Sequence, residues 1–387
     1  MKIFHCDHCQ HLVFFENFRC LSCERLLAYV PDTQDVVSLD AVDEMHWKTR
    51  DGREYRLCPN YTDHNVCNWA IAKDDDHLHC VSCRLTQVIP DLDKPGNRES
   101  WFKLEAGKRR LINSLLRLGV PILNRVDDPE RGLAFEFKAD PDKKDKDAKP
   151  VLTGHAHGVI TINLAEADDP ERERRRVALR EPYRTVLGHF RHEVGHYYWD
   201  RLILNSDRLD KCRELFGDER VSYAESLKKY YANGPAQDWQ QSFVSAYSTM
   251  HPWEDWAETW THYMHINEVL ETAAVTGLSM SPKRTNQPTL KAIPLSSIDH
   301  PHTFDRMIRA WYPITFLLNN LNRDMGMQDA YPFVLTAPVI EKLRYIHETI
   351  VTAPAVLPTE EEEIAAVAQR DEAAAVEAEK KLVSAKA

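Results

Sequence analysis

The alternation of hydrophobic and polar positions predicts a strand and two long helices in the middle of the chain. In "GVITINLAEADD" isoleucine and leucine alternate with threonine and asparagine, which is the two-residue period of a half-buried strand, expected over Val159–Ala165. The apolar spacing then becomes helical from Glu181 to about Leu204, with Pro182 suited to the first turn. "HPWEDWAETWTHYMHINEVLETA" predicts a second helix that begins at Pro252.

Helical spacing covers most of the remaining chain beyond a Pro-, Asp- and Gly-containing linker, "IPDLDKPGN". We expect helices in "SWFKLEAGKRRLINSLLRLG", in most of "NSDRLDKCRELFGDERVSYAESLKKYYANGPAQDW" up to a break at Asn233-Gly234-Pro235, and in "DHPHTFDRMIRAWYPITFLLNNLNRDMG" and "PVIEKLRYIHETIV". "ADPDKKDKDAKP" is too charged to pack and predicts a solvated loop. The expected fold class is α+β: a β-rich region over 1–92, a mainly helical domain with a small sheet over 98–353, and an acidic, alanine-rich mobile tail over 354–387.

The cysteines change this picture at the N-terminal end. Eight of the nine lie in the first 83 residues, in a chain that starts without the basic and apolar segments of a signal peptide, so metal binding is favoured over disulfides. Two C-x2-C pairs ten residues apart predict one structural zinc site, and a C-x8-C pair followed by C-x2-C predicts a second. Their ligands would be Cys6, Cys9, Cys20 and Cys23 in the first site, and Cys58, Cys67, Cys80 and Cys83 in the second.

Charge and hydropathy limit the partners. The net charge is -11, and residues 1–90 hold nine Lys and Arg against fourteen Asp and Glu, which disfavours nucleic-acid binding by the ribbons. Substrate docking or structural support is the favoured role for the ribbons, and docking of a protein partner on them is an alternative. No apolar run approaches the length of a membrane span, so we expect a cytoplasmic protein that does not bind membranes.

The stretch "GHFRHEVGHYYWD" contains the spacing His192-Glu193-x-x-His196. On a helix the two histidines are one turn apart, so their ring nitrogens can share one zinc ion about 2.0 to 2.1 Å away. Glu193 lies on the adjoining stripe, where it can take a proton from zinc-bound water instead of coordinating. Gly195 would let another element approach this helix closely. The bare motif is short and the chain has 18 histidines, so chance is a serious alternative.

Two histidines leave a catalytic zinc one protein ligand short. In "HPWEDWAETWTHYMH" a polar stripe of Glu254, Glu258 and His262 runs along a helix otherwise rich in aromatic residues. We assign Glu254 as the third ligand and Glu258 as the carboxylate that orients a zinc-bound imidazole. Glu258 and Asp255 are the alternative ligands, and the strand over Val159–Ala165 would offer an edge for an extended peptide.

A donor is also needed for the oxyanion that forms during hydrolysis. Tyr247 and Tyr263 are the candidate donors, and His262 and His189 are further candidates. For each of the four, a packing or supporting role is the alternative. Asp200, one turn beyond His196, is compatible with support of a zinc-bound imidazole or with an exposed charge. His155 and His157 in "TGHAHG" fit a polar turn, and Cys212 fits a small packed residue.

These segments together resemble a known family. "CPNYTDHNVCNWAI", "CVSCRLTQVIPDL", "EPYRTVLGHFRHEVGHYYWDRL", "LFGDERVSYAESL", "HPWEDWAETWTHYMH" and "NRDMGMQDAYPFVL" are similar to a bacterial family of zinc-binding metallopeptidases with an N-terminal zinc ribbon. With the first cysteine cluster, the resemblance spans most of residues 3–350. It implies a zinc-ribbon region over 1–92 and a zincin-like metallopeptidase domain over 98–353. In that domain His192, Glu193 and His196 would form the site, and the "ExxxE" of Glu254 and Glu258 would mark the helix that supplies a glutamate ligand.

The leading hypothesis is therefore a zinc hydrolase that cleaves peptide bonds, with one catalytic and two structural Zn²⁺ ions and a peptide or protein as substrate. The alternative is a non-catalytic zinc protein that binds a partner or regulates it, in which a fourth protein ligand such as His262 closes the site. Nucleic-acid binding through the ribbons is a third hypothesis, which their acidic composition disfavours.

Overall fold

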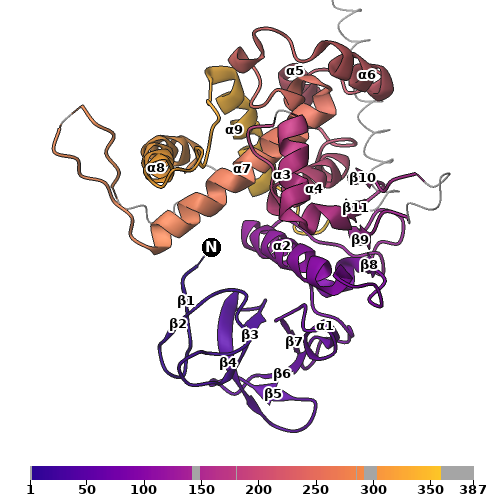
Figure 1. Cartoon of the computed structure of the whole chain (residues 1–387), viewed down its shortest axis with the longest axis vertical. Helices are drawn as coiled ribbons and strands as arrows, with labels where there is room; N and C mark the ends of the chain where they lie inside the picture. The colour runs from indigo at the N-terminus through magenta and orange to yellow at the C-terminus, as the bar shows by residue number, and fades with distance from the viewer. Residues whose placement is uncertain (1, 142–148, 180, 285, 292–302, 359–387) are drawn as a thin grey trace, which may run out of the picture.

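The computed structural model describes residues 2–141, 149–179, 181–284, 286–291 and 303–358. Its strand-rich N-terminal part lies at one end of the molecule and the helices fill the other (Figure 1). The expected α+β class is confirmed, because a β-rich region with two four-cysteine groups precedes a mainly helical region with a small mixed sheet. The charged segment expected to be a loop lies partly outside the described residues, as does the expected tail from 359 onward.

The N-terminal part is built from seven short strands, all paired antiparallel within two sheets. A two-stranded sheet carries the first cysteine knuckle, and a five-stranded sheet follows in the order β3-β4-β5-β6-β7. One turn of helix, α1 (Pro59–Thr62), begins directly after Cys58. The strands are β1 (Phe4–His5), β2 (Leu12–Val13), β3 (Leu26–Val30), β4 (Asp35–Ala41), β5 (Trp47–Lys48), β6 (Glu54–Leu57) and β7 (Ala70–Ala72).

The second sheet has the order β10-β11-β9-β8. β8 (Thr86–Val88) directly follows a 3-10 turn, η1 (Cys83–Leu85), and pairs in parallel with β9 (Ala134–Lys138), so the end of the cysteine-rich region joins the sheet of the helical region. β11 (Val159–Asn163) pairs in parallel with β9 on one side and antiparallel with β10 (Gly154–Ala156) on the other.

The expectation of an edge strand over Val159–Ala165 was therefore wrong. β11 is an inner strand, and β10 is the edge, because the chain turns at His157 and Gly158 with positive φ angles of 47° and 81° and folds back on itself. A side chain at Gly158 would clash with the backbone oxygen of Gly132 at 2.6 Å, so this turn depends on glycine. The chain leaves β11 through a 3-10 turn, η2 (Leu164–Ala167).

The two long helices expected from the sequence are present with one changed boundary. α4 (Val186–Leu202) begins later than Glu181, because Thr185 is extended and its hydroxyl caps the helix by accepting from the Gly188 N–H. Pro182 therefore precedes the helix and does not lie in its first turn. α7 (Pro252–Val275) begins at the expected proline.

The other helices surround these two. The helix end expected at Asn233-Gly234-Pro235 is confirmed, since α6 ends at Asn233. α3 was not expected; Asp168 caps it and Glu–Arg pairs line its surface. The remaining elements are α2 (Asn97–Leu118), α3 (Asp169–Ala178), α5 (Leu209–Phe216), α6 (Tyr223–Asn233), η3 (Trp239–Gln241), η4 (Tyr247–Thr249), α8 (Phe304–Asp324) and α9 (Ala337–Val351).

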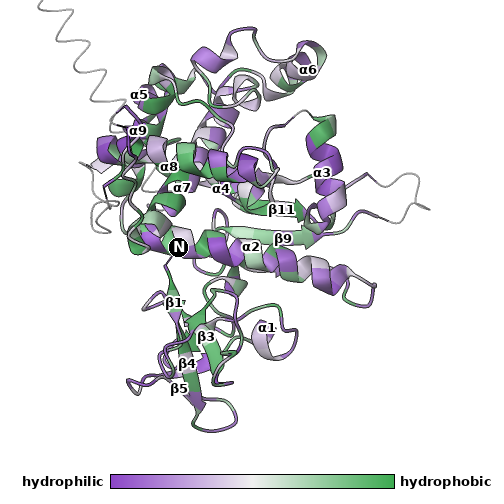
Figure 2. Ribbon diagram, turned by 60° about the vertical axis from the view of Figure 1, so that its left-hand side comes forward, coloured by the Kyte–Doolittle hydropathy of each residue, from purple (hydrophilic) through white to green (hydrophobic). Residues whose placement is uncertain are grey.

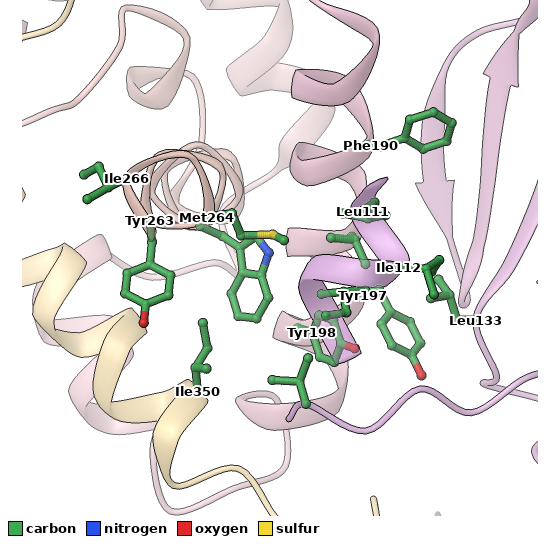
Figure 3. Close-up of a cluster of buried hydrophobic side chains, with 14 of the residues drawn as sticks. Leu111, Ile112, Leu133, Phe190, Tyr197, Tyr198, Tyr263, Met264, Ile266 and Ile350 are labelled. Carbon is green, nitrogen blue, oxygen red and sulfur yellow. The ribbon is translucent and has the colours of Figure 1, made fainter. Parts of the chain in front are cut away.

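The core lies where α2 and α4 pack together against the sheet and α7 packs across α4. Hydrophobic residues concentrate on β9 and β11 (Figure 2), and Phe190 of α4 packs its ring against Phe135 and Phe137 of β9 at centroid distances of 5.7 and 6.3 Å. Figure 3 shows part of this core, including Leu111, Tyr198 and Met264. None of the helices in the described ranges is long and apolar enough to cross a membrane.

Candidate metal centre

Three side chains from α4 and α7 converge on one point. The Nε2 atoms of His192 and His196 are 3.1 Å apart, and Oε2 of Glu254 is 2.9 Å from the first and 3.5 Å from the second. Ligands placed tetrahedrally around a zinc ion at 2.0 to 2.1 Å are separated by about 3.3 Å. The donor set and its spacing therefore fit Zn²⁺.

The crossing of α4 and α7 creates this convergence. Gly195 allows it, because a side chain there would lie 3.1 Å from Cα of Ala257 and 3.2 Å from Cβ of Trp260. Trp256 fixes the crossing by donating its indole N–H to the carbonyl of Gly195 at 2.9 Å. The role expected for Gly195, close approach of another element, is confirmed.

The charges of the three groups also fit a cation between them. Glu254 is 2% exposed. Its Oε2 makes no well-oriented hydrogen bond, although Nε2 of His192 lies 2.9 Å away. Burial raises the pKa of Glu254, but His196 and His192 outweigh it and hold the pKa well below its usual value. Burial lowers the pKa of His192, and Glu254 and Glu258 raise it well above its usual value. Three donor atoms that converge on one buried point are typical of a metal site.

Further side chains hold these ligands in place. Glu258 lies with Oε1 2.8 Å from Nδ1 of His192, as expected for a carboxylate that orients a ligating imidazole, and Ser245 donates to its Oε2 at 2.6 Å. Tyr223 of α6 donates to Oε1 of Glu254 at 2.7 Å. No pattern in the sequence points to Tyr223 or Ser245, because each reaches the group only through the packing of the segment between α4 and α7.

The alternative ligand Asp255 does not join the group. Its carboxylate pairs with Nζ of Lys342 on α9 at 2.6 Å. Burial raises the pKa of Asp255 to about 7, although the charge of Lys342 acts in the opposite direction. His262 is likewise engaged elsewhere, with Nδ1 2.6 Å from the hydroxyl of Tyr331. Within the described part of the chain, no fourth histidine, cysteine or carboxylate completes the group.

The structure separates the four candidate oxyanion donors. The ring of Tyr247 lies 6.1 Å from that of His192, so this tyrosine borders the metal group. The hydroxyl of Tyr263 instead lies 2.9 Å from Nδ1 of His347 on α9, and Figure 3 shows the ring pointing toward that helix. His189 lies with Nδ1 3.2 Å from Oε2 of Glu166. Tyr263, His262 and His189 are thus not brought to the metal group.

Glu193 lies beside the group with its carboxylate unengaged. It is 8% exposed, and no hydrogen bond or ion pair joins it to another described residue. Burial and then the charge of Glu254 raise the pKa of Tyr223, and the charge of Glu193 adds a smaller contribution. Glu193 therefore lies close to this tyrosine. An uncommitted carboxylate next to three converging ligands is suited to proton transfer.

His155 and Asp200 add a feature that the sequence left open. His155 belongs to β10 and not to a polar turn; its side chain is 1% exposed, and its ring lies parallel to that of His196 at 6.3 Å with an angle of 18°. Burial and then His196 lower the pKa of His155 to about 3, so the ring is neutral. Burial raises the pKa of Asp200 to about 6. His157 is exposed in the turn, as expected.

Both cysteine groups assemble as predicted. Within each, the four sulfur atoms lie within 4.8 Å of one another. In the second group all four cysteines are buried, whereas in the first Cys9 and Cys23 are partly exposed. Four thiolates complete a tetrahedral zinc shell, so both groups fit structural zinc. Cys212 is buried on α5, away from both groups.

Comparison with known families decides what these features belong to. The family described as "Putative zinc-binding metallo-peptidase" matches residues 97–349, and a zinc-ribbon domain family matches residues 3–94. The chain belongs to this metallopeptidase family. As a family member it combines zinc ribbons with a His-His-Glu group of the HExxH type, as the resemblance implied.

The chain is also similar to mycobacterial proteins of the same length class. The chain is 42% identical over 352 residues to the uncharacterized proteins Mb2598c of Mycobacterium bovis and Rv2568c of Mycobacterium tuberculosis, which covers 90% of this chain and 95% of each relative. No solved structure matches it significantly.

Proposed function

We propose that this protein hydrolyses peptide bonds in a peptide or protein substrate and depends on zinc. The observation that supports this most strongly is the three-ligand group His192, His196 and Glu254 with the unengaged carboxylate of Glu193 beside it. Structural zinc sites are closed by four protein ligands, whereas catalytic sites keep one position open. The cysteine groups of this chain have the closed set, and the histidine group has the open one.

Each nearby side chain has a distinct role in this proposal. Zinc bound by the three ligands would polarise the scissile carbonyl and favour ionisation of the attacking water. Glu193 takes a proton from that water and returns it to the leaving amine. Glu258 holds the proton on Nδ1 of His192, which leaves the Nε2 lone pair free. Tyr247 donates to the oxygen of the scissile carbonyl.

The free edge of β10 is the proposed binding site for the substrate backbone. Within the residues that the structure describes, β10 pairs with β11 along one side only, and it contacts α4. An extended peptide can add to such an edge through backbone hydrogen bonds. The carbonyl to be cleaved would then be presented to the group on α4. We keep docking of the substrate protein on the zinc ribbons as a proposal as well.

The test is the substitution Glu193→Gln in the full chain, assayed on unfolded casein and on a mixture of fluorogenic peptides. Loss of the base should lower the cleavage rate by about 10²- to 10⁴-fold, while the zinc content per chain stays unchanged. Glu214→Gln, at a glutamate whose side chain is 66% exposed on α5, is the matched control and should cleave at the normal rate.

Unchanged cleavage by the Glu193→Gln protein would refute the mechanism. The same variant can be used to capture proteins from cell extract, because an inactive enzyme that still holds zinc should retain its substrate. Cleavage of a captured protein by the wild-type chain, but not by the variant, would identify that protein as a substrate.

A further inference from the structure

The two ligating histidines differ in what holds their outer nitrogens. Nδ1 of His192 faces Glu258 at 2.8 Å, whereas Nδ1 of His196 is buried, with less than 1 Å² exposed, and has no hydrogen-bond partner. A metal-ligating histidine almost always donates this N–H to a carboxylate, a carbonyl or water. A buried N–H without an acceptor costs about 1–3 kcal/mol, so an acceptor for His196 is to be expected close by.

A second buried imidazole beside it has the same need. Nε2 of His155 accepts the backbone N–H of Gly158 at 3.0 Å, so Nδ1 of this neutral ring carries the proton. That Nδ1 also has less than 1 Å² exposed and no partner. The rings of His155 and His196 lie parallel at 6.3 Å, so two buried N–H donors without acceptors occupy neighbouring positions.

One carboxylate lies within reach of this pair. Asp200 is one turn beyond His196 on α4, and its Oδ2 is 4.0 Å from Nδ1 of His155. This distance exceeds that of a hydrogen bond by about 1 Å, which a small rotation of the side chain can close. Both nitrogens are shielded from bulk water, with less than 1 Å² exposed each, whereas the Asp200 side chain is 33% exposed, so the carboxylate can turn toward them from the edge of the site. A carboxylate has two oxygens and can accept from both donors.

We propose that Asp200 is the positioning carboxylate of His196, as Glu258 is of His192, and that the same carboxylate also accepts from His155. The inference rests on the proposed function only in taking the three-ligand group as a zinc site. Because His155 belongs to the edge strand β10, this arrangement ties the strand to the helix that carries the ligands. The free edge of β10 and the metal group would thereby keep a fixed relative position.

The experiment measures zinc affinity at the histidine group in the full chain. A chromogenic chelator competes for the third zinc equivalent while both cysteine groups stay loaded. Asp200→Ala should weaken this equivalent by about 10- to 100-fold, the usual effect of removing the partner of a metal ligand. Asp200→Asn should lose less, because its amide oxygen still accepts a hydrogen bond. Glu258→Ala, which removes the partner of His192, is the positive control.

Thermal unfolding separates positioning from a general structural role. With the third equivalent removed, wild type and Asp200→Asn should unfold at nearly the same temperature, and zinc should raise the midpoint less in the variant. Wild-type zinc affinity in both Asp200 variants, with weakened binding in Glu258→Ala, would overturn the inference and leave the proposed function standing. A wild-type chain that holds only two zinc equivalents would instead overturn the proposed function.

Discussion

The two four-cysteine groups have similar ligands but are integrated into the molecule differently. In the first group Cys9 and Cys23 are partly exposed, and an ion pair between Glu16 and Arg110, exposed by 29% and 41%, joins the neighbouring loop to α2. All four cysteines of the second group are buried, and the chain passes from Cys83 directly into β8 of the second sheet. The comparison indicates that the second group is more deeply buried and is joined directly to the sheet of the helical region.

Buried charges on α2 explain this integration. Nζ of Lys108 lies 2.9 Å from Oε1 of Glu105, both side chains are fully buried, and the ammonium also donates to Thr86 of β8. Hydrogen bonds from the other three cysteines, and then the charge of Lys108, lower the pKa of the Cys83 thiol well below its usual value. Four thiolates around Zn²⁺ carry a net negative charge, which a buried cation nearby offsets. The five-stranded sheet is also tied to α2, through the buried bond from Tyr29 to Asn113 at 2.5 Å.

The largest expected difference between the two groups comes from replacing one cysteine ligand in each. Cys80→Ser should lower the free energy of unfolding of the whole chain by more than about 4 kcal/mol. Without the metal, the three remaining buried thiols next to α2 would no longer be held together. Cys9→Ser should unfold the first knuckle and leave the helical region intact. Hydrogen exchange of β9 and β11 in both variants is the measurement. Equal protection of these strands in the two variants would contradict the difference between the groups.

Lys108→Met tests the buried cation itself. Removing one partner of a buried ion pair costs about 3–5 kcal/mol, because the charge of Glu105 stays uncompensated. Denaturant unfolding should show this loss, together with weaker retention of zinc by the second group. In the double variant Glu105→Leu with Lys108→Met, stability should recover while zinc retention stays weak. Normal zinc retention in both variants would show that Lys108 serves only Glu105.

The smallest effect is expected at the surface contact of the first group. Arg110→Gln removes the partly exposed pair with Glu16, and such pairs contribute about 0–1 kcal/mol. We expect a midpoint within about 1 kcal/mol of wild type by denaturant unfolding, and a difference that shrinks further in high salt. A loss as large as that of Lys108→Met would mean that both groups are anchored to α2 equally.

Much of the fold and the site followed from local patterns. The spacing of His192 and His196, the proline start of α7 and the cysteine pairs each depend on residues close in sequence, so their geometry is fixed by helix period and ligand chemistry. The start of α4 was misplaced because the capping hydroxyl of Thr185 overrides the preference of Pro182 for a first turn. The edge strand was misassigned because Gly154–Ala156 is too short to show a strand period.

The sequence by itself determined the donor atoms: eight thiols in two groups, two histidines one turn apart and a carboxylate helix downstream. The tertiary structure decided which atoms meet. It selected Glu254 over Asp255 as the third member of the group, placed Tyr247 at the site and Tyr263 against α9, and brought in Tyr223 and His155. The physical reason is that ligand type depends on side-chain chemistry, whereas convergence depends on how α4, α6, α7 and β10 pack across long distances in sequence.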